Sequence, residues 1–180
     1  MINQNTFTGP SFSLKNRLFR VVWNLTYLIL FRFSPIYFFG WRSFILKCFG
    51  AEIGGGVHIY PAVKIWAPWN LKIGRQSGIA SSSVLYSQAK ITIGEKSVIS
   101  QGVNLCTGTH DYTKHGFPLV ALPINIGNQV WIAADAFIHP GVTIADGCVI
   151  GARAVVISDM PEWTVCTGHP CRPVKARKLE

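Results

Sequence analysis

Acidic residues are scarce in this chain, which has 8 Asp and Glu against 17 Lys and Arg and a formal net charge of +9 over 180 residues. This imbalance favours anionic partners such as phosphorylated cofactors, acidic glycans or lipid head groups. Nucleic acid is not an expected partner, because the sequence has no zinc-finger spacing, arginine-rich run, helix-turn-helix or RRM pattern. Hydrophobic residues make up 49% of the chain, which is ample for a core.

Paired cysteines are also missing. The five cysteines are odd in number and are not spaced like the ligands of a zinc site: Cys48, Cys106, Cys148, Cys166 and Cys171. This usage is typical of a reducing compartment and predicts neither a disulfide framework nor a metal site. No cleavable signal peptide is expected, because the first apolar stretch starts well inside the chain. We therefore expect a cytoplasmic protein.

A long uncharged hydrophobic run is the third absence. After a polar arm over residues 1–13, residues 14–50 are strongly apolar, but Pro35 divides them and cations interrupt them, among them Arg17, Arg20, Arg32, Arg42 and Lys47. Neither half supplies the ~20 uncharged residues of a membrane-spanning helix. The segment predicts two short helices. They either lie on an anionic membrane surface or cap the next domain, and the sequence leaves both open.

The chain does contain a six-residue repeat. A small or apolar residue follows nearly every aliphatic residue of the repeat four positions later. The aliphatic side chains recur at every sixth position within each of these series: Ile53, Ile59, Ile65; Ile73, Ile79, Leu85; Ile93, Ile99, Leu105; Ile126, Ile132, Ile138, Ile144, Ile150 and Val156. This period fits neither a helix nor an ordinary strand. It predicts an all-β solenoid over residues 51–160.

The frame of the repeat shifts regularly. Three hexads are followed by two extra residues, which predicts about five triangular coils that start near Ile53, Ile73, Ile93, Ile126 and Ile144. Stacked coils lie ~4.8 Å apart, and each buries the apolar face of its neighbour. A glycine follows the aliphatic residue at five corners, where we expect torsions that a side chain would resist: Gly54, Gly74, Gly94, Gly127 and Gly151.

Two segments depart from the repeat. Residues 106–123 form an insertion, and insertions that leave a solenoid corner commonly carry function. This insertion contains His110, which is suited to act as a general base because imidazole exchanges protons near neutral pH. Residues 161–180 form a basic tail that includes Arg172 and Lys175.

Four motifs resemble the left-handed β-helix hexapeptide-repeat acyltransferases, and sugar O-acetyltransferases in particular. They are Cys-Thr-Gly-Thr-His110-Asp-Tyr, Ile126-Gly-Asn-Gln-Val-Trp131-Ile-Ala, Pro140-Gly-Val-Thr-Ile144-Ala-Asp-Gly and Gly168-His-Pro-Cys-Arg172-Pro-Val-Lys175. The resemblance covers roughly residues 50–176. The apolar N-terminal segment, with Trp41-Arg42 and Phe49-Gly50-Ala51, is most similar to acetyltransferases of colanic acid and related exopolysaccharide pathways.

The resemblance implies a homotrimer that binds acetyl-CoA in the groove between neighbouring β-helices, with the insertion of one subunit reaching towards the next. His110 takes the place of the catalytic base, which removes a proton from a sugar hydroxyl for direct acetyl transfer without an acyl-enzyme. The resemblance implies that the acceptor is a sugar or lipid-linked oligosaccharide, presented at the inner face of the cytoplasmic membrane. No metal is expected.

The resemblance also implies a set of cofactor contacts. Trp131 falls where a tryptophan lines the groove, Ala134 and Ala152 fall where main-chain groups meet the pantetheine arm, and Arg172 and Lys175 fall near the nucleotide phosphates. The last assignment has independent physical sense, because phosphates need cations.

Some positions differ from the family pattern. Ala134 stands where some relatives have serine, which leaves a backbone N–H to stabilise the thioester oxyanion. The resemblance places Ser158 at a cofactor-binding position, where sugar acetyltransferase relatives have a lysine. Ser81 lies where relatives carry an asparagine that holds the acceptor, and it joins Asp111 and Tyr112 as a candidate acceptor contact. The sequence does not identify the sugar.

Two other functions remain open. A γ-type carbonic anhydrase is suggested by His110 and His115, which are spaced like two zinc ligands of that family. A catalytic zinc needs three protein ligands, and the third histidine is not at its expected position. The second alternative is a non-catalytic membrane-associated scaffold, which residues 14–50 alone would support.

Overall fold

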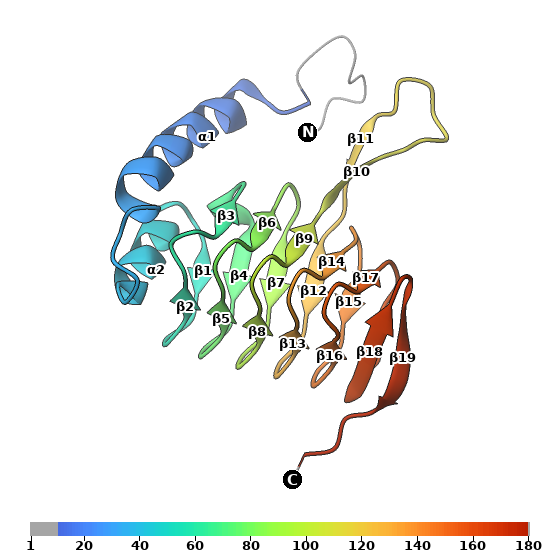
Figure 1. Ribbon diagram of the computed structural model, residues 1–180. Helices are drawn as coiled ribbons and strands as arrows, with labels where there is room; N and C mark the ends of the chain where they lie inside the picture. Colours follow the sequence, from blue (N-terminus) through green and yellow to red (C-terminus); the bar gives the residue numbers. More distant parts are fainter. Residues whose placement is uncertain (1–10, 180) are drawn as a thin grey trace.

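The computed structural model describes residues 11–179, which form a triangular solenoid with helices at its N-terminal end (Figure 1). Residues 1–10 of the predicted polar arm lie outside the described residues. Three sheets form the walls of the prism, and the stacked strands within each wall are parallel, as the repeat predicts, except for the last strand of one wall. The solenoid is a left-handed parallel β-helix.

The chain passes through the three walls in a fixed order in each coil. Wall A comprises β1 (Glu52–Ile53), β4 (Leu71–Ile73), β7 (Ile91–Ile93), β12 (Ile124–Ile126) and β15 (Thr143–Ile144). Wall B comprises β2 (His58–Ile59), β5 (Gly78–Ile79), β8 (Val98–Ile99), β13 (Trp131–Ile132), β16 (Val149–Ile150), β18 (Thr164–Gly168) and β19 (Cys171–Ala176). Wall C comprises β3 (Lys64–Ile65), β6 (Val84–Tyr86), β9 (Asn104–Cys106), β14 (Phe137–Ile138) and β17 (Val155–Val156).

The aliphatic residues of the repeat stack in register inside the prism. In wall A, Ile53 pairs with Ile73, Ile73 with Ile93, Ile93 with Ile126 and Ile126 with Ile144. These side chains are almost completely buried and belong to one hydrophobic core. The predicted coil starts are therefore confirmed.

The solenoid is slightly longer than the predicted five coils. After five complete coils, Met160 pairs with Ile144 in wall A, and β18 pairs with β16 in wall B, so two sides of a sixth turn are present. Met160 and Cys166 fill the interior positions of this turn. The sequence did not reveal it, because neither residue is the branched aliphatic that marks the other coils.

The corner glycines have a different cause from the one predicted. None of the five has a positive φ; the left-handed torsions fall two residues later at several corners, as at Gln76 (56°), Lys96 (54°) and Gln129 (55°). Gly94 instead sits against the next coil, where an added Cβ would lie 2.5 Å from the backbone carbon of Gly127. Glycine is needed here for close approach of successive backbones.

The N-terminal segment forms helices that cover the first coil. These are α1 (Leu14–Thr26), the π-helical turn η1 (Tyr27–Phe31) and α2 (Phe39–Cys48), with Pro35 in the connection as predicted. The Ser13 hydroxyl accepts a hydrogen bond from the Asn16 N–H (3.3 Å) and caps α1. Trp23 is fully buried, and its indole N–H donates to the Ile65 carbonyl (2.8 Å). The segment is therefore a cap of the solenoid.

The outer surface of the same helices remains apolar. Its exposed large side chains include Leu18, Leu25, Ile29, Phe33, Tyr37 and Phe44. Within residues 11–179, no helix has the length and hydrophobicity to cross a bilayer.

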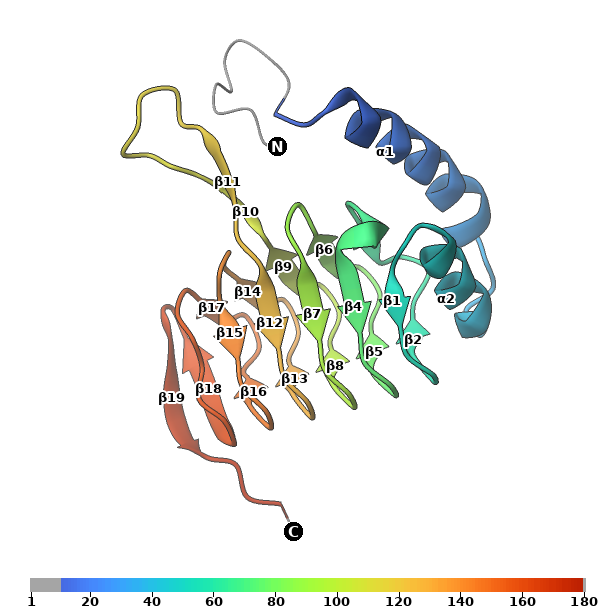
Figure 2. The ribbon, with the colours of Figure 1, turned by 180° about the vertical axis from the view of Figure 1, so that it is seen from behind.

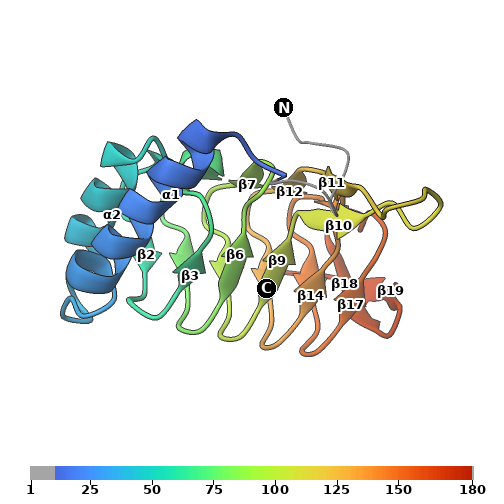
Figure 3. The ribbon, with the colours of Figure 1, turned by 90° about the horizontal axis from the view of Figure 1, so that it is seen from above.

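Two hairpins leave the regular stack. The insertion forms β10 (Gly108–His110) and β11 (Leu119–Ala121), an antiparallel pair that projects from the edge of the stack towards which the start of α1 also extends (Figure 2). The C-terminal segment is not a simple tail, because β18 and β19 pair antiparallel at the end of the solenoid opposite α1 and α2 (Figure 3). The turn between β18 and β19 contains a cis peptide bond at His169–Pro170.

Candidate functional site

His110 lies at the corner between walls C and A, where the chain leaves the solenoid. The buried Thr107 anchors this exit, because its hydroxyl donates to the Tyr86 carbonyl of the preceding coil (2.7 Å). His110 then pairs with Leu119 across the hairpin. Its ring is exposed, and its Nδ1 lies 2.6 Å from the Phe117 carbonyl oxygen. A carbonyl can only accept, so Nδ1 carries the proton and Nε2 of the neutral ring keeps a free lone pair.

A pocket of about 360 Å³ opens beside His110. Its lining comes from the start of α1, from the C–A corners of the first two coils and from the hairpin: Ser11, Phe12, Arg17, Arg20, Trp66, Tyr86, Gln88, His110 and Leu119. The pocket has the basic, aromatic and amide groups that bind a polar ring. Such sites combine an apolar wall with a few placed polar groups.

Trp66, Tyr86 and Gln88 are site residues that the sequence did not single out. The rings of Trp66 and Tyr86 contact edge to face at 6.2 Å, and the Gln88 amide donates to the Tyr86 hydroxyl (2.8 Å). The repeat could have revealed Tyr86 and Gln88 as site residues, because Leu85 and Leu105 occupy equivalent positions and are paired in wall C. Residues just after Leu85 must therefore lie next to those just after Leu105, which lead to His110.

The two predicted acceptor contacts in the hairpin differ in their surroundings. The Asp111 carboxylate accepts hydrogen bonds from the Thr113 hydroxyl (2.6 Å) and backbone N–H (3.0 Å). These bonds, with Lys114 nearby at 3.4 Å, hold the pKa of the Asp111 carboxyl below its ordinary value. Tyr112 is 82% exposed. Asp111 thus stabilises the loop turn, and Tyr112 is free to contact a partner.

Trp131 lies on the outer face of wall B, in a row that crosses five neighbouring strands from β8 to β19. The successive pairs are Val98 with Trp131, Trp131 with Val149, Val149 with Val165 and Val165 with Lys175. The Trp131 ring is 49% exposed, and its N–H donates to the Ser100 hydroxyl (3.0 Å). From Trp131 to Lys175 the row spans about 14 Å, the width of three strand spacings.

Arg172 and Lys175 face the same side of wall B because of a β-bulge. Arg172 pairs with Thr167 and Lys175 with Val165, while the register shifts in between, so Val174 is the extra residue on β19. Without the bulge, residues three apart on a strand would point to opposite faces. Both cations are exposed, so the end of the row that starts at Trp131 is positively charged.

Ala134 and Ala152 occupy successive corners between walls B and C, and Ser81 occupies the same edge two coils before Ala134. The Arg153 N–H donates to the Ala134 carbonyl (2.8 Å), which sets Ala134 directly against the corner that contains Ala152. Among residues 11–179, neither the Ala134 nor the Ala152 N–H has a hydrogen-bond acceptor. Both amides are therefore free to donate to a bound group.

One chain does not bring all the predicted residues together. Trp131, Arg172 and Lys175 lie on wall B, and the alanine corners lie along its edge with wall C. His110 lies at the far edge of wall C, one full wall away. Ser158 is exposed at the C–A corner after β17 and is not part of the wall B row.

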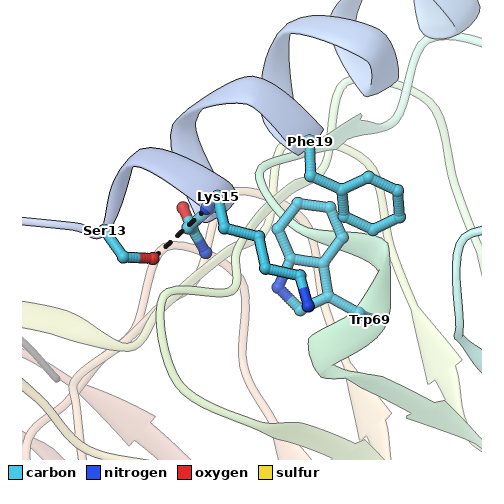
Figure 4. A pocket seen from close by; sticks show the side chains of 5 residues that line it. Ser13, Lys15, Phe19 and Trp69 are labelled. Carbon is cyan, nitrogen blue, oxygen red and sulfur yellow. Dashed lines mark hydrogen bonds between the residues drawn. The ribbon is translucent and has the colours of Figure 1, made fainter.

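A smaller hollow of about 280 Å³ lies on the other side of the first turns of α1. Lys15 and Phe19 extend from the helix towards Trp69, which belongs to the short 3-10 helix η2 (Pro68–Asn70) (Figure 4). The rings of Phe19 and Trp69 are 4.7 Å apart. This hollow is an apolar seam between α1 and the first coil, and it does not include His110.

His115, the second histidine of the insertion, is exposed in the hairpin loop. In the part of the chain that the structure describes, no three His, Cys, Asp or Glu side chains are grouped so that they could hold a metal ion. Residues 11–179 of one chain therefore do not bring together the three protein ligands of a zinc site of the carbonic anhydrase type.

Comparison with known proteins gives consistent results. The family model for the bacterial transferase hexapeptide (six repeats) matches residues 123–158. The putative colanic acid biosynthesis acetyltransferase WcaF of Escherichia coli (strain K12) is 44% identical over 156 residues, which cover 87% of this chain and 86% of that protein.

Two solved structures share the fold over most of their length. Galactoside acetyltransferase in complex with coenzyme A superposes with a TM-score of 0.84 at 29% identity, covering 92% of this chain and 84% of that chain. A hexapeptide-repeat acetyltransferase from Vibrio cholerae, complexed with acetyl coenzyme A, gives a TM-score of 0.84 at 25% identity, covering 99% and 97%. The chain therefore belongs to the hexapeptide-repeat acetyltransferase family.

Proposed function

We propose that this protein is an acetyl-CoA-dependent O-acetyltransferase that modifies a sugar hydroxyl in the biosynthesis of an exopolysaccharide of the colanic acid type. The main supporting observation is the geometry of His110, whose Nε2 lone pair is available beside a pocket large enough for a sugar ring. The similarity to the colanic acid relative supports the pathway, and the CoA complexes of the two solved relatives support the acetyl donor.

In the proposed reaction, Nε2 of His110 takes the proton of the sugar hydroxyl. The sugar oxygen forms the new C–O bond to the acetyl carbon, the C–S bond breaks, and the proton passes to the CoA sulfur. Nδ1 donates to the Phe117 carbonyl throughout, which keeps the ring oriented and favours its protonated form during the step. No covalent acetyl-enzyme is needed.

The donor site lies along wall B in this proposal. Trp131 contacts the pantetheine arm, the free N–H groups of Ala134 and Ala152 donate to it or to the thioester oxyanion, and Arg172 and Lys175 bind the phosphates. Because these residues are one wall away from His110, the complete site requires His110 from one subunit and wall B from the next. A homotrimer meets this requirement.

Mass spectrometry of the glycan tests the function. Incubation of the purified protein with acetyl-CoA and the polysaccharide, or its lipid-linked precursor, should add one acetyl mass that mild base removes, as expected for an O-acetyl ester. Transfer to an amine, which mild base does not reverse, or release of free acetate alone would contradict sugar O-acetylation.

We also propose that the outer face of α1, η1 and α2 binds the inner face of the cytoplasmic membrane peripherally. Exposed apolar side chains cover this face, and the exposed cations Lys15 and Lys47 flank it. Interfacial helices combine apolar and basic residues in this way. Such binding would bring the His110 pocket, which α1 helps to line, close to an acceptor carried on a lipid.

A further inference from the structure

The pocket beside His110 contains two arginines that come from α1. Arg17 and Arg20 lie three positions apart on the helix and therefore on one face of it. Arg17 and Arg20 line the same pocket as His110, which comes from the hairpin. This arrangement places two fixed positive charges beside the candidate base.

Arg20 is held in place by an aromatic surface. Its guanidinium carbon lies 4.1 Å from the centre of the Trp66 ring, and Phe12 packs against the same ring at 4.8 Å. A guanidinium stacked on a ring still has its in-plane N–H groups available, and these match the two oxygens of a carboxylate or phosphate. Arg20 is therefore preorganised for an anion.

Within the described part of the chain, no acidic side chain forms an ion pair with these arginines. The ion pairs among residues 11–179 use Glu52, Glu95, Asp111 and Asp135, and none includes Arg17 or Arg20. The pocket lining contains no Asp or Glu. Two unpaired cations at a polar pocket leave its potential positive, which attracts a negatively charged ligand.

We infer that the acceptor sugar carries an anionic group, a phosphate or a carboxylate, which Arg17 and Arg20 bind while His110 faces the hydroxyl to be acetylated. This inference rests on the proposed function and adds the substrate class. The aromatic wall of Trp66 and Tyr86 suits the sugar ring between the two ends of the pocket.

The test compares hexose acceptors with and without an anionic substituent. Methyl glycosides, 1-phosphates and uronic acids of glucose, galactose and mannose are assayed with acetyl-CoA for wild type, for Arg17→Gln/Arg20→Gln and for the control Arg32→Gln. Arg32 follows η1 and does not line the pocket. Binding of each hexose 1-phosphate and uronic acid is measured separately by calorimetry, so the result does not depend on turnover.

We expect the double variant to lose about 10- to 100-fold in kcat/KM and in affinity for the anionic compounds, the usual worth of charge-assisted hydrogen bonds, and less than about threefold for the neutral glycosides. Arg32→Gln should match wild type. A preference for the phosphates or for the uronic acids identifies the anion.

Equal use of neutral and charged acceptors, or equal binding of the anions by wild type and double variant, would overturn the inference while leaving O-acetylation intact. Anion binding that needs both arginines, with no transfer to any sugar, would instead count against the proposed function alone.

Discussion

Arg42 shows how a single buried charge fixes the helical cap to the solenoid. Its side chain is completely buried; Nε donates to the Ile59 carbonyl (2.5 Å), and Nη1 donates to the Ser34 hydroxyl (2.9 Å) and the Pro35 carbonyl (2.8 Å). Nη2 donates to the Ile36 carbonyl. Burial lowers the pKa of the guanidinium, but four acceptors surround it and the group stays charged. From sequence alone, Arg42 looked like one of the cations that interrupt an apolar run.

Replacing Arg42 tests this role. Arg42→Met should lower the free energy of unfolding by about 2–5 kcal/mol, because it leaves several buried acceptors without a donor. Urea denaturation measures the change. The control is Arg153→Met, at an exposed arginine that forms a long ion pair with Asp135 (3.9 Å), and it should shift stability by less than about 0.5 kcal/mol. Equal effects of the two substitutions would show that Arg42 is not a structural anchor.

At the scale of the element, the sequence predicted where strands and corners lie better than it predicted the physical reasons for them. The aliphatic series gave the strands and their register, because each interior position must be filled in every coil. The corner glycines were located correctly, but close contact between coils, which is visible only when coils are stacked, explains them. The β18–β19 hairpin was missed, because Met160 and Cys166 carry weaker signals than isoleucine. The insertion at His110 was evident, whereas its partners on α1 could not be found without knowing where that helix packs.

Two glycines at A–B corners of different coils, Gly94 and Gly55, distinguish a need for close approach between coils from a need for backbone flexibility. Gly94→Ala should destabilise the protein by about 2–4 kcal/mol, since the new Cβ meets rigid backbone of the next coil. Gly55→Ala has no atom within 4 Å of its Cβ and no positive φ, so it should be neutral or stabilising by up to about 1 kcal/mol. Thermal unfolding of both variants decides the question. Similar losses in the two would contradict the close-packing explanation.

The whole molecule has two proposed functional surfaces at opposite ends of the prism. The helical cap offers an apolar, basic face and lines the His110 pocket, whereas the C-terminal hairpin presents Arg172 and Lys175. A rigid solenoid between them holds the proposed acceptor and donor sites at a fixed distance. The sequence indicated the residues of both surfaces, but it could not show that they lie on different walls, which is the reason for proposing a site shared by two subunits.

Flotation with liposomes tests the membrane surface. Wild type should bind vesicles that contain anionic lipid more strongly than neutral vesicles. Leu25→Glu/Ile29→Glu, at side chains 56% and 67% exposed, should reduce the bound fraction at least about fivefold. Leu179→Glu, equally exposed (62%) but at the other end of the chain, is the control. Equal recovery of all three proteins with and without lipid would rule out membrane binding by this face.

The most direct test of the whole account is the steady-state rate of acetyl transfer by His110→Ala, measured together with the Kd for acetyl-CoA. We predict that kcat falls by about two to four powers of ten, as expected for loss of a general base, while the Kd changes by less than about twofold. Arg172→Ala should show the opposite pattern, with a raised KM for acetyl-CoA and a nearly unchanged kcat. If His110→Ala instead turns over within about threefold of wild type, His110 is not the base and the proposed mechanism is wrong.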